Sequence, residues 1–169
     1  MALSQEIYAV RIDEDIAKYS NSTNMISLML FIACLTVAHA CTCALQPTVK
    51  EAYCKSNVDI VTLARVMSTD NSDTNPGGAW KYVIFHLRTW KGFDKLRNIT
   101  TSILTTANSE SACGLTGLLD DWDYLLTGKF GENGEIKITS CDLYMAWYDV
   151  TTEERDLLKD LRDGVEKCE

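Results

Sequence analysis

The stretch from Met25 to Cys43 constrains this chain more than any other. Residues Met25–Val37 are mostly apolar, but the run is shorter than the ~20 residues that a membrane-spanning helix needs. It ends in Ala38-His39-Ala40, a small-x-small pattern that signal peptidase cleaves. Cys41 follows at once, and Cys43 comes two residues later. We therefore predict that Cys41 is the N-terminus of the mature protein.

These boundaries divide the chain into three parts. Residues 1–24 are polar and acidic, and we interpret them as an upstream extension that is either rarely translated or wrongly included. Residues 25–40 form the predicted signal peptide, although no positive charge opens it. Residues 41–169 form one domain, which is long enough for a core of its own. We predict a secreted, extracellular protein with no membrane span, and a glycan on Asn98 in the sequon Asn98-Ile99-Thr100.

Seven cysteines occur in the chain. Cys34 lies in the predicted leader, and the other six belong to the mature domain: Cys41, Cys43, Cys54, Cys113, Cys141 and Cys168. An even number behind a secretory leader indicates three disulfides formed in an oxidising compartment. The sequence alone does not choose among the possible pairings. A reduced cytosolic protein would leave the leader unexplained, and a redox enzyme using Cys41 and Cys43 would need an exposed thiolate of low pKa.

The predicted N-terminus could bind a metal ion. A free α-amino group and the carbonyl oxygen of the same residue, here Cys41, can close a five-membered chelate ring. His86 is the one histidine after the leader, so a zinc centre or a catalytic triad within this chain is poorly supported. We therefore expect no cofactor of the protein's own and a metal ion that belongs to a partner. We expect His86 itself to be a packed or surface histidine.

The charge of the chain limits its partners. Lys and Arg number 16 against 24 Asp and Glu, and the net charge is −8. This acidity and the lack of a basic cluster in the sequence disfavour nucleic acid as a partner. We attribute the acidity to solubility, and we expect a monomer. Asp120-Asp121-x-Asp123 lacks the remaining ligands of a calcium loop, so we interpret it as a solvated acidic turn.

The mature sequence alternates strand-like runs and turns. Runs rich in Val, Ile, Thr and aromatic residues predict five strands, at Val58–Met67, Trp80–Trp90, Ile99–Ala107, Tyr124–Phe130 and Glu135–Thr139. Gly131-Glu132-Asn133-Gly134 predicts a hairpin turn between the last two. Pro47 predicts the first turn of a short helix, and Thr151 with Glu154 predicts a capping box before a C-terminal helix. The pattern favours a mainly β fold, a small closed five-stranded barrel of OB-fold shape with flanking helices.

Several of these segments resemble one family. Cys41-Thr42-Cys43 after a cleavage site, Trp90-Lys91-Gly92-Phe93, Ser109–Gly114 and Gly134–Cys141 are similar to the N-terminal, netrin-like domain of the tissue inhibitors of metalloproteinases. The resemblance covers nearly all of residues 41–169. It implies a secreted inhibitor of zinc metalloproteases, matrix metalloproteinase-like or related, and not an enzyme.

The resemblance also implies roles for individual residues. Cys41 would bind the zinc of the target protease through its amine and carbonyl, and Thr42 would enter a substrate pocket of the protease. The zinc would be supplied by the protease. The other protease-binding positions would be Cys43, Ala44, Leu45, Ser111 and Ala112. The implied disulfides are Cys41–Cys113, Cys43–Cys141 and Cys54–Cys168.

The chain departs from the family pattern in two places. Ala44 and Leu45 stand where many members have Val-Pro, which leaves the protease preference open. Members with two domains continue well beyond the position of Glu169, so functions of a second domain are not carried over. The alternative function is a netrin-like extracellular module that captures another protein without inhibiting proteases. Such a module needs no free amine on Cys41.

Overall fold

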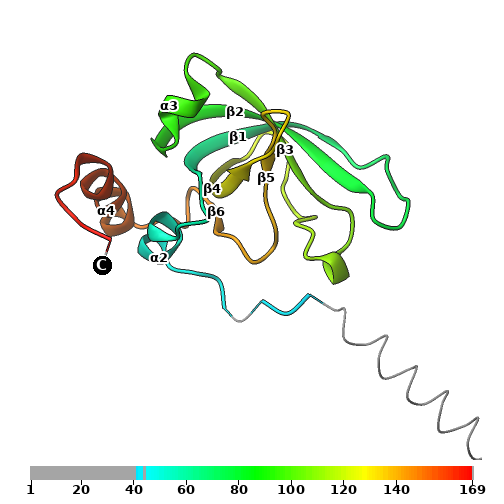
Figure 1. The fold of residues 1–169 in the computed structure, drawn as a ribbon, viewed down its shortest axis with the longest axis horizontal. Coiled ribbons are helices and arrows are strands. Elements are labelled where there is room, and N and C mark those ends of the chain that lie inside the picture. Colours follow the sequence, from blue (N-terminus) through cyan, green and yellow to red (C-terminus); the bar gives the residue numbers. More distant parts are fainter. Residues whose placement is uncertain (1–40, 44, 169) are drawn as a thin grey trace, which may run out of the picture. The chain divides into compact units, whose positions relative to one another are not determined.

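The structure is a computed structural model that describes residues 41–43 and 45–168. The predicted upstream extension and signal peptide, residues 1–40, lie outside the described residues, as do Ala44 and Glu169. Within the described part, no helix is long and apolar enough to cross a membrane. Strands dominate this part of the chain, and helices lie at its margins (Figure 1).

Five strands are joined into a ring (Figure 1). The order around the ring is β1 (Ile60–Asp70), β2 (Ala79–Lys91), β3 (Thr101–Ala107), β5 (Ile136–Lys137) and β4 (Asp123–Phe130), which pairs back to β1. The pairings are antiparallel except for β3 with β5, which is parallel. A short strand, β6 (Tyr144–Ala146), pairs with β4. The predicted fold class, mainly β with an OB-like arrangement, is confirmed.

The predicted strands are present with shifted ends. β1 continues to Asp70, beyond the predicted end at Met67. The predicted strand Glu135–Thr139 shrinks to the two residues of β5. β6 was not predicted, because three residues are too few to show an alternating pattern. The hairpin turn before β5 is confirmed: Gly134 has φ of +76°, which a side chain would oppose.

The first half of β1, residues 60–64, is buried on both faces, which explains its mostly apolar sequence. Ile60, Ala64 and Val66 contribute to the core inside the ring. Val61 and Leu63 belong to a second core, which also contains residues of the helices. The β1–β2 register shifts at three points along the strand. Such irregularities increase strand bending, and the bent β1 pairs with both β2 and β4.

Two short helices border the strands. α2 (Val49–Cys54) begins after Thr48, which forms a capping box with Glu51. Pro47 therefore lies just before the cap, and the prediction that it occupies the first turn is wrong. α3 (Phe93–Leu96) follows β2 directly, with Gly92 at its N-cap in the left-handed region.

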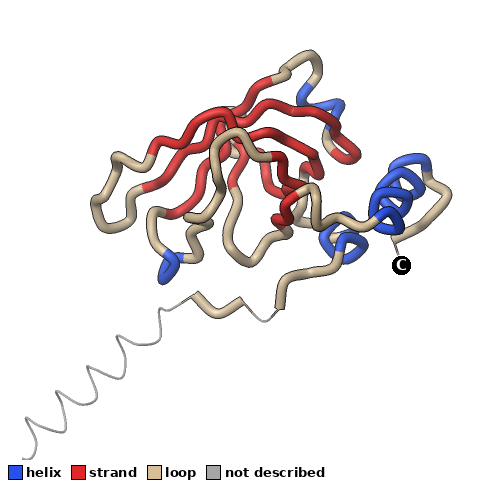
Figure 2. Tube along the Cα trace, turned by 180° about the vertical axis from the view of Figure 1, so that it is seen from behind, coloured by secondary structure: helices blue, strands red, loops and turns tan. Residues whose placement is uncertain are grey.

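The C-terminal helix is fastened to α2. α4 (Thr152–Asp163) begins at the predicted capping box of Thr151 and Glu154. The disulfide Cys54–Cys168 links the end of α2 to the segment after α4, with a Cα–Cα distance of 5.2 Å. An ion pair of 2.5 Å between Lys50 and Glu166 joins the same two regions. Both helices therefore lie together beside the strands (Figure 2).

Candidate functional site

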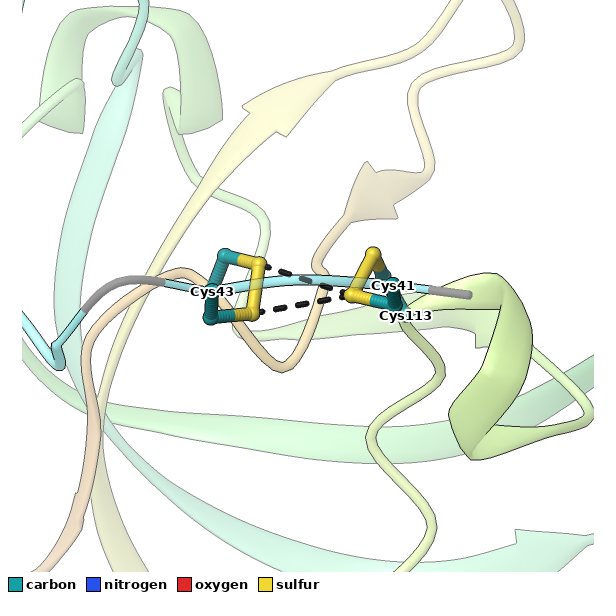
Figure 3. A group of neighbouring side chains, drawn as sticks. Cys41, Cys43 and Cys113 are labelled. Atoms are coloured by element: carbon teal, nitrogen blue, oxygen red, sulfur yellow. Dashed lines mark hydrogen bonds between the residues drawn. A yellow bond between two sulfur atoms is a disulfide. The ribbon is translucent and has the colours of Figure 1, made fainter. Parts of the chain in front are cut away.

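Residues 41–43 belong to no strand or helix and are held by covalent bonds. Cys41 is bonded to Cys113 and Cys43 to Cys141, with Cα–Cα distances of 5.0 and 5.1 Å (Figure 3). The partners lie 72 and 98 residues away in the sequence. All three disulfides have the pairing that the family resemblance implies. We call residues 41–43, 109–113 and 140–141 together the disulfide edge.

The two disulfides of this edge touch each other. Sγ of Cys41 lies 3.6 Å from Sγ of Cys43 and 3.7 Å from Sγ of Cys141 (Figure 3). The four sulfurs lie within 4.8 Å of one another, a spacing that would suit a zinc ion if they were thiolates. Each sulfur is already bonded to another, so none can act as a thiolate. Because Cys41 and Cys43 are bonded to distant partners, they are also not the dithiol pair of a redox enzyme.

The nitrogen of Cys41 has a defined orientation. It donates a hydrogen bond of 2.9 Å to the carbonyl oxygen of Ser111. Ser111 lies in the short 3₁₀ turn Glu110–Ala112, so this turn runs beside the N-terminal segment. The bond aligns the nitrogen of Cys41 relative to the carbonyl group of the same residue. Nothing in the sequence pattern pointed to this backbone contact.

Backbone hydrogen bonds hold the turn that carries Ser111. The amide of Gly114 donates to the carbonyl of Ser109 at 2.8 Å, and the amide of Ser140 donates to the carbonyl of Cys113 at 2.9 Å. A Cβ on Gly114 would clash with the carbonyl oxygen of Ala107, so this close approach requires glycine. A role for Gly114 was not predicted from the sequence. The one sequence signal for this role was that a glycine, Gly114, directly follows a cysteine.

Most of the predicted contact residues that the structure describes are exposed. Thr42, Ser111 and Ala112 are exposed, whereas Cys41 and Cys43 are half-buried. Leu45 is 89% exposed just beyond the edge, and Ala44 lies outside the described residues. The structure therefore brings the N-terminal triplet and Ser111-Ala112 together. It presents the side chains of Thr42, Ser111 and Ala112 to solvent on a backbone that disulfides hold in place.

The remaining candidates lie elsewhere in the fold. Arg65 donates to both carboxylate oxygens of Asp123, at 2.7 and 3.0 Å. Thr69 donates to Asp120 at 2.6 Å. These contacts agree with the predicted acidic turn rather than with a calcium loop. Asn98 is exposed after α3, where a glycosyl transferase could reach it.

His86 is a packed histidine on β2, as predicted. Its Nδ1 lies 3.0 Å from Oγ1 of Thr62, and its Nε2 lies 2.9 Å from Oγ of Ser102. Burial lowers the pKa of His86 below its ordinary value, because the charged imidazolium is poorly solvated there. The ring is therefore neutral at physiological pH, and its contacts are structural.

Comparison with known sequences decides the family. The family model described as tissue inhibitor of metalloproteinase matches residues 39–169. The chain belongs to this family. Metalloproteinase inhibitor 3 of Scyliorhinus torazame is 29% identical over 138 residues, which cover 80% of the chain and 62% of the relative. Metalloproteinase inhibitor 3 of Gallus gallus is 31% identical over 120 residues, or 70% of the chain and 53% of the relative.

A second type of relative gives the same family. Metalloproteinase inhibitor 2 of Homo sapiens is 29% identical over 143 residues, which cover 79% of the chain and 60% of the relative. The chain thus spans between 53% and 62% of the length of these family members. Their names describe inhibitors of metalloproteinases. The region that the family model matches, residues 39–169, includes the disulfide edge.

Proposed function

We propose that this protein is a secreted inhibitor of zinc metalloproteases and that its mature chain begins at Cys41. Family membership and the inhibitor relatives support this function. The observation that carries it is the exposed disulfide edge, where Cys41 is bonded to Cys113 and its nitrogen is aligned by Ser111. The protein acts as a monomer, is not an enzyme, and needs no cofactor of its own.

Cleavage before Cys41 would convert its amide nitrogen into a primary amine. In its neutral form the amine has two hydrogens and one lone pair. One hydrogen can keep the bond to the Ser111 carbonyl, which lies 2.9 Å from the nitrogen. The lone pair is then directed outward, next to the carbonyl oxygen of Cys41. These two atoms would bind the zinc of the target protease in place of the water that attacks the substrate.

The amine must be neutral to bind, because a protonated amine has no lone pair. A free α-amino group has a pKa of about 7.7–8.0. A proton therefore leaves when the amine binds at neutral pH. Inhibition weakens as the pH falls below this range, since a growing fraction of Cys41 amine must first lose its proton.

The exposed side chains of the edge provide contact with the protease. Thr42 stands between the two anchored cysteines and enters the pocket that receives a substrate side chain. Cys43, Ala44 and Leu45 extend this contact, and Ser111 with Ala112 forms a second line beside it. Because the disulfides already hold the backbone, little conformational entropy is lost on binding.

One extra alanine before Cys41 tests this mechanism. It converts the amine into an amide, whose nitrogen has no lone pair available for a metal, and leaves the disulfides intact. We expect the extended protein to fold, by circular dichroism and by the absence of free thiols, and to lose inhibition of a matrix metalloproteinase catalytic domain. The same alanine added after Glu169 is the control and should change nothing. Full inhibition by the N-terminally extended protein would overturn the mechanism.

Mass spectrometry of the secreted protein tests the proposed start of the mature chain. We expect an N-terminal Cys41 and three disulfides. A mature chain that retains any residue before Cys41 has no free amine at this position. That result would favour the netrin-like module that captures an extracellular protein without inhibiting proteases.

A further inference from the structure

Two large aromatic side chains are exposed in contact with each other, where β4 begins and where β6 has ended. Trp122 is 42% exposed and Tyr148 is 69% exposed. Their ring centroids lie 5.5 Å apart, and the ring planes meet at 70°. Single exposed aromatic residues are common, but a contacting pair forms an apolar surface that favours interaction with another molecule.

The two rings border a hollow in the surface. Its volume is about 340 Å³, and it is lined by Asp121, Trp122, Asp123, Trp147 and Tyr148. Trp147 is the least exposed of the three aromatic rings. The guanidinium of Arg155 lies 4.3 Å from the centroid of the Trp147 ring. An arginine stacked on an aromatic ring is therefore already part of this region.

The backbone around the hollow is held by strands. The amide of Asp121 donates to the carbonyl of Val66 at 2.7 Å, and the amide of Val66 donates to the carbonyl of Trp122 at 3.0 Å. The amide of Trp147 donates to the carbonyl of Asp123 at 2.8 Å. These bonds tie both walls to β1 and β4, so the hollow does not have to form when a ligand arrives.

The two carboxylates of the hollow have different surroundings. Asp123 accepts two hydrogen bonds from Arg65, so its charge is compensated. Asp121 is exposed, and no hydrogen bond or ion pair engages its carboxylate within the described residues. Arg65 attracts Asp121 only at longer range. An aromatic corner beside such a carboxylate favours a cation, through the ring quadrupoles and the Coulomb attraction.

We propose that this hollow binds an exposed arginine side chain of a partner protein. The planar guanidinium stacks against Trp122 and Tyr148 and donates hydrogen bonds to Asp121. Arginine fits better than lysine because it stacks on aromatic faces, is less strongly hydrated and donates in a planar fork. This site is a second interaction surface, built from residues that the disulfide edge does not contain. The protein would therefore bind such a partner whether or not it inhibits proteases.

A peptide titration of the full mature domain tests the proposal. The probe is an acetylated and amidated octapeptide of alternating glycine and arginine, and the matched peptides carry lysine or glutamine in place of arginine. Calorimetry gives the affinity, and the indole N–H signals of the tryptophans report the location. We expect the arginine peptide to bind most tightly, the lysine peptide more weakly, and the glutamine peptide not at all. The Trp122 indole signal should move as the arginine peptide saturates.

Matched variants separate this hollow from the general acidity of the protein. Trp122→Ala, Tyr148→Ala and Asp121→Asn should each weaken binding of the arginine peptide by about two- to fivefold. Phe93→Ala removes another aromatic side chain, which is 61% exposed, and Asp156→Asn removes an exposed charge on α4. Both of these control variants should leave the affinity unchanged. If Trp122→Ala fails to fold, Tyr148→Ala tests the same aromatic pair.

Several outcomes would overturn the proposal. Equal binding of the glutamine peptide would exclude recognition of a cation. An equal loss in Asp156→Asn would show that net charge attracts the peptide, and an equal loss in Phe93→Ala would show that this hollow is not the specific binding site. Saturable movement of the Trp122 signal with chitotriose but not with the arginine peptide would identify a sugar site instead. Movement of the signal with protein concentration alone would mean that a second copy of the chain covers the aromatic pair.

Discussion

The strand ring and the disulfide edge are held together by different forces. In the ring, Tyr82, Ile84 and Leu104 are fully buried, and backbone pairing runs continuously from strand to strand. In the disulfide edge, side chains such as Thr42 and Ser111 face solvent, and two covalent bonds replace the missing core. The strand ring therefore provides stability, and the disulfide edge provides the surface for recognition. The edge can present side chains to solvent because disulfides, and not a core, hold its backbone.

A substitution inside the ring should have the largest effect on stability. Leu104 is fully buried and lies between Tyr82 and Ile136 across the neighbouring strands. Leu104→Ala removes this packing and should lower the free energy of unfolding by about 2–5 kcal/mol. Urea denaturation followed by circular dichroism measures the loss. Ile103→Ala on the same strand is the control, since Ile103 is 41% exposed. An equal loss of stability in this variant would mean that burial in the core does not explain the effect of Leu104→Ala.

Removal of one disulfide should show most clearly that the disulfide edge and the strand ring have different roles. Replacing Cys41 and Cys113 together by serine should lower the free energy of unfolding by about 2–4 kcal/mol. It should also abolish inhibition, because the residue at position 41 is no longer held beside Ser111. Replacing Cys54 and Cys168 by serine is the control, because that bond joins residues 114 positions apart and contains no residue of the disulfide edge. If the folded control variant loses inhibition to the same degree, the disulfide edge does not act separately from the rest of the domain.

A change on the edge alone should affect binding and not folding. Thr42→Gly removes an exposed side chain at the centre of the proposed interface, and such a loss can cost about 2 kcal/mol of binding free energy. The inhibition constant against several metalloprotease catalytic domains measures this effect, and thermal unfolding should stay unchanged. Unchanged inhibition of all of them would remove Thr42 from the proposed site.

A smaller change in stability should come from the protonation of His86, which lies in the strand ring. The pKa of His86 is lowered by burial from its ordinary value of 6.5, so the folded state binds fewer protons than the unfolded state. The contribution of His86 to stability is full above pH 6.5 and is lost as the pH falls through the lower folded pKa. Urea midpoints between about pH 7.5 and 5 measure this decline. His86→Gln should flatten the profile, and an unchanged slope in this variant would assign the decline to other groups.

The smallest effect is expected at Asn98. Asn98→Gln should remove a glycan, visible as a loss of mass, while stability and inhibition change by no more than about 0.5 kcal/mol. The residue is exposed beyond α3 and belongs to neither the core nor the disulfide edge. A large gain of inhibition in this variant would mean that the glycan reaches the protease-binding surface.

Local features of the structure were predictable from the sequence. The strands follow runs of β-branched and aromatic residues, and the Asn133-Gly134 turn joins β4 to β5. The capping box of Thr151 and Glu154 marks the start of α4. These features depend on residues a few positions apart, so their physical causes are visible in the sequence itself. The six mature cysteines likewise indicated three disulfides, but their pairing came only from the family resemblance.

The arrangement of the candidate site was decided by the tertiary structure. The hydrogen bond from Cys41 to Ser111, the contact between two disulfides and the aromatic pair of Trp122 and Tyr148 each join residues far apart in the chain. β6 forms only because β4 offers it an edge, since three residues have too little preference to form a strand alone. Such contacts depend on how the strand ring and the disulfides bring distant segments together. The sequence therefore determined which residues could act, and the closed ring determined which of them meet.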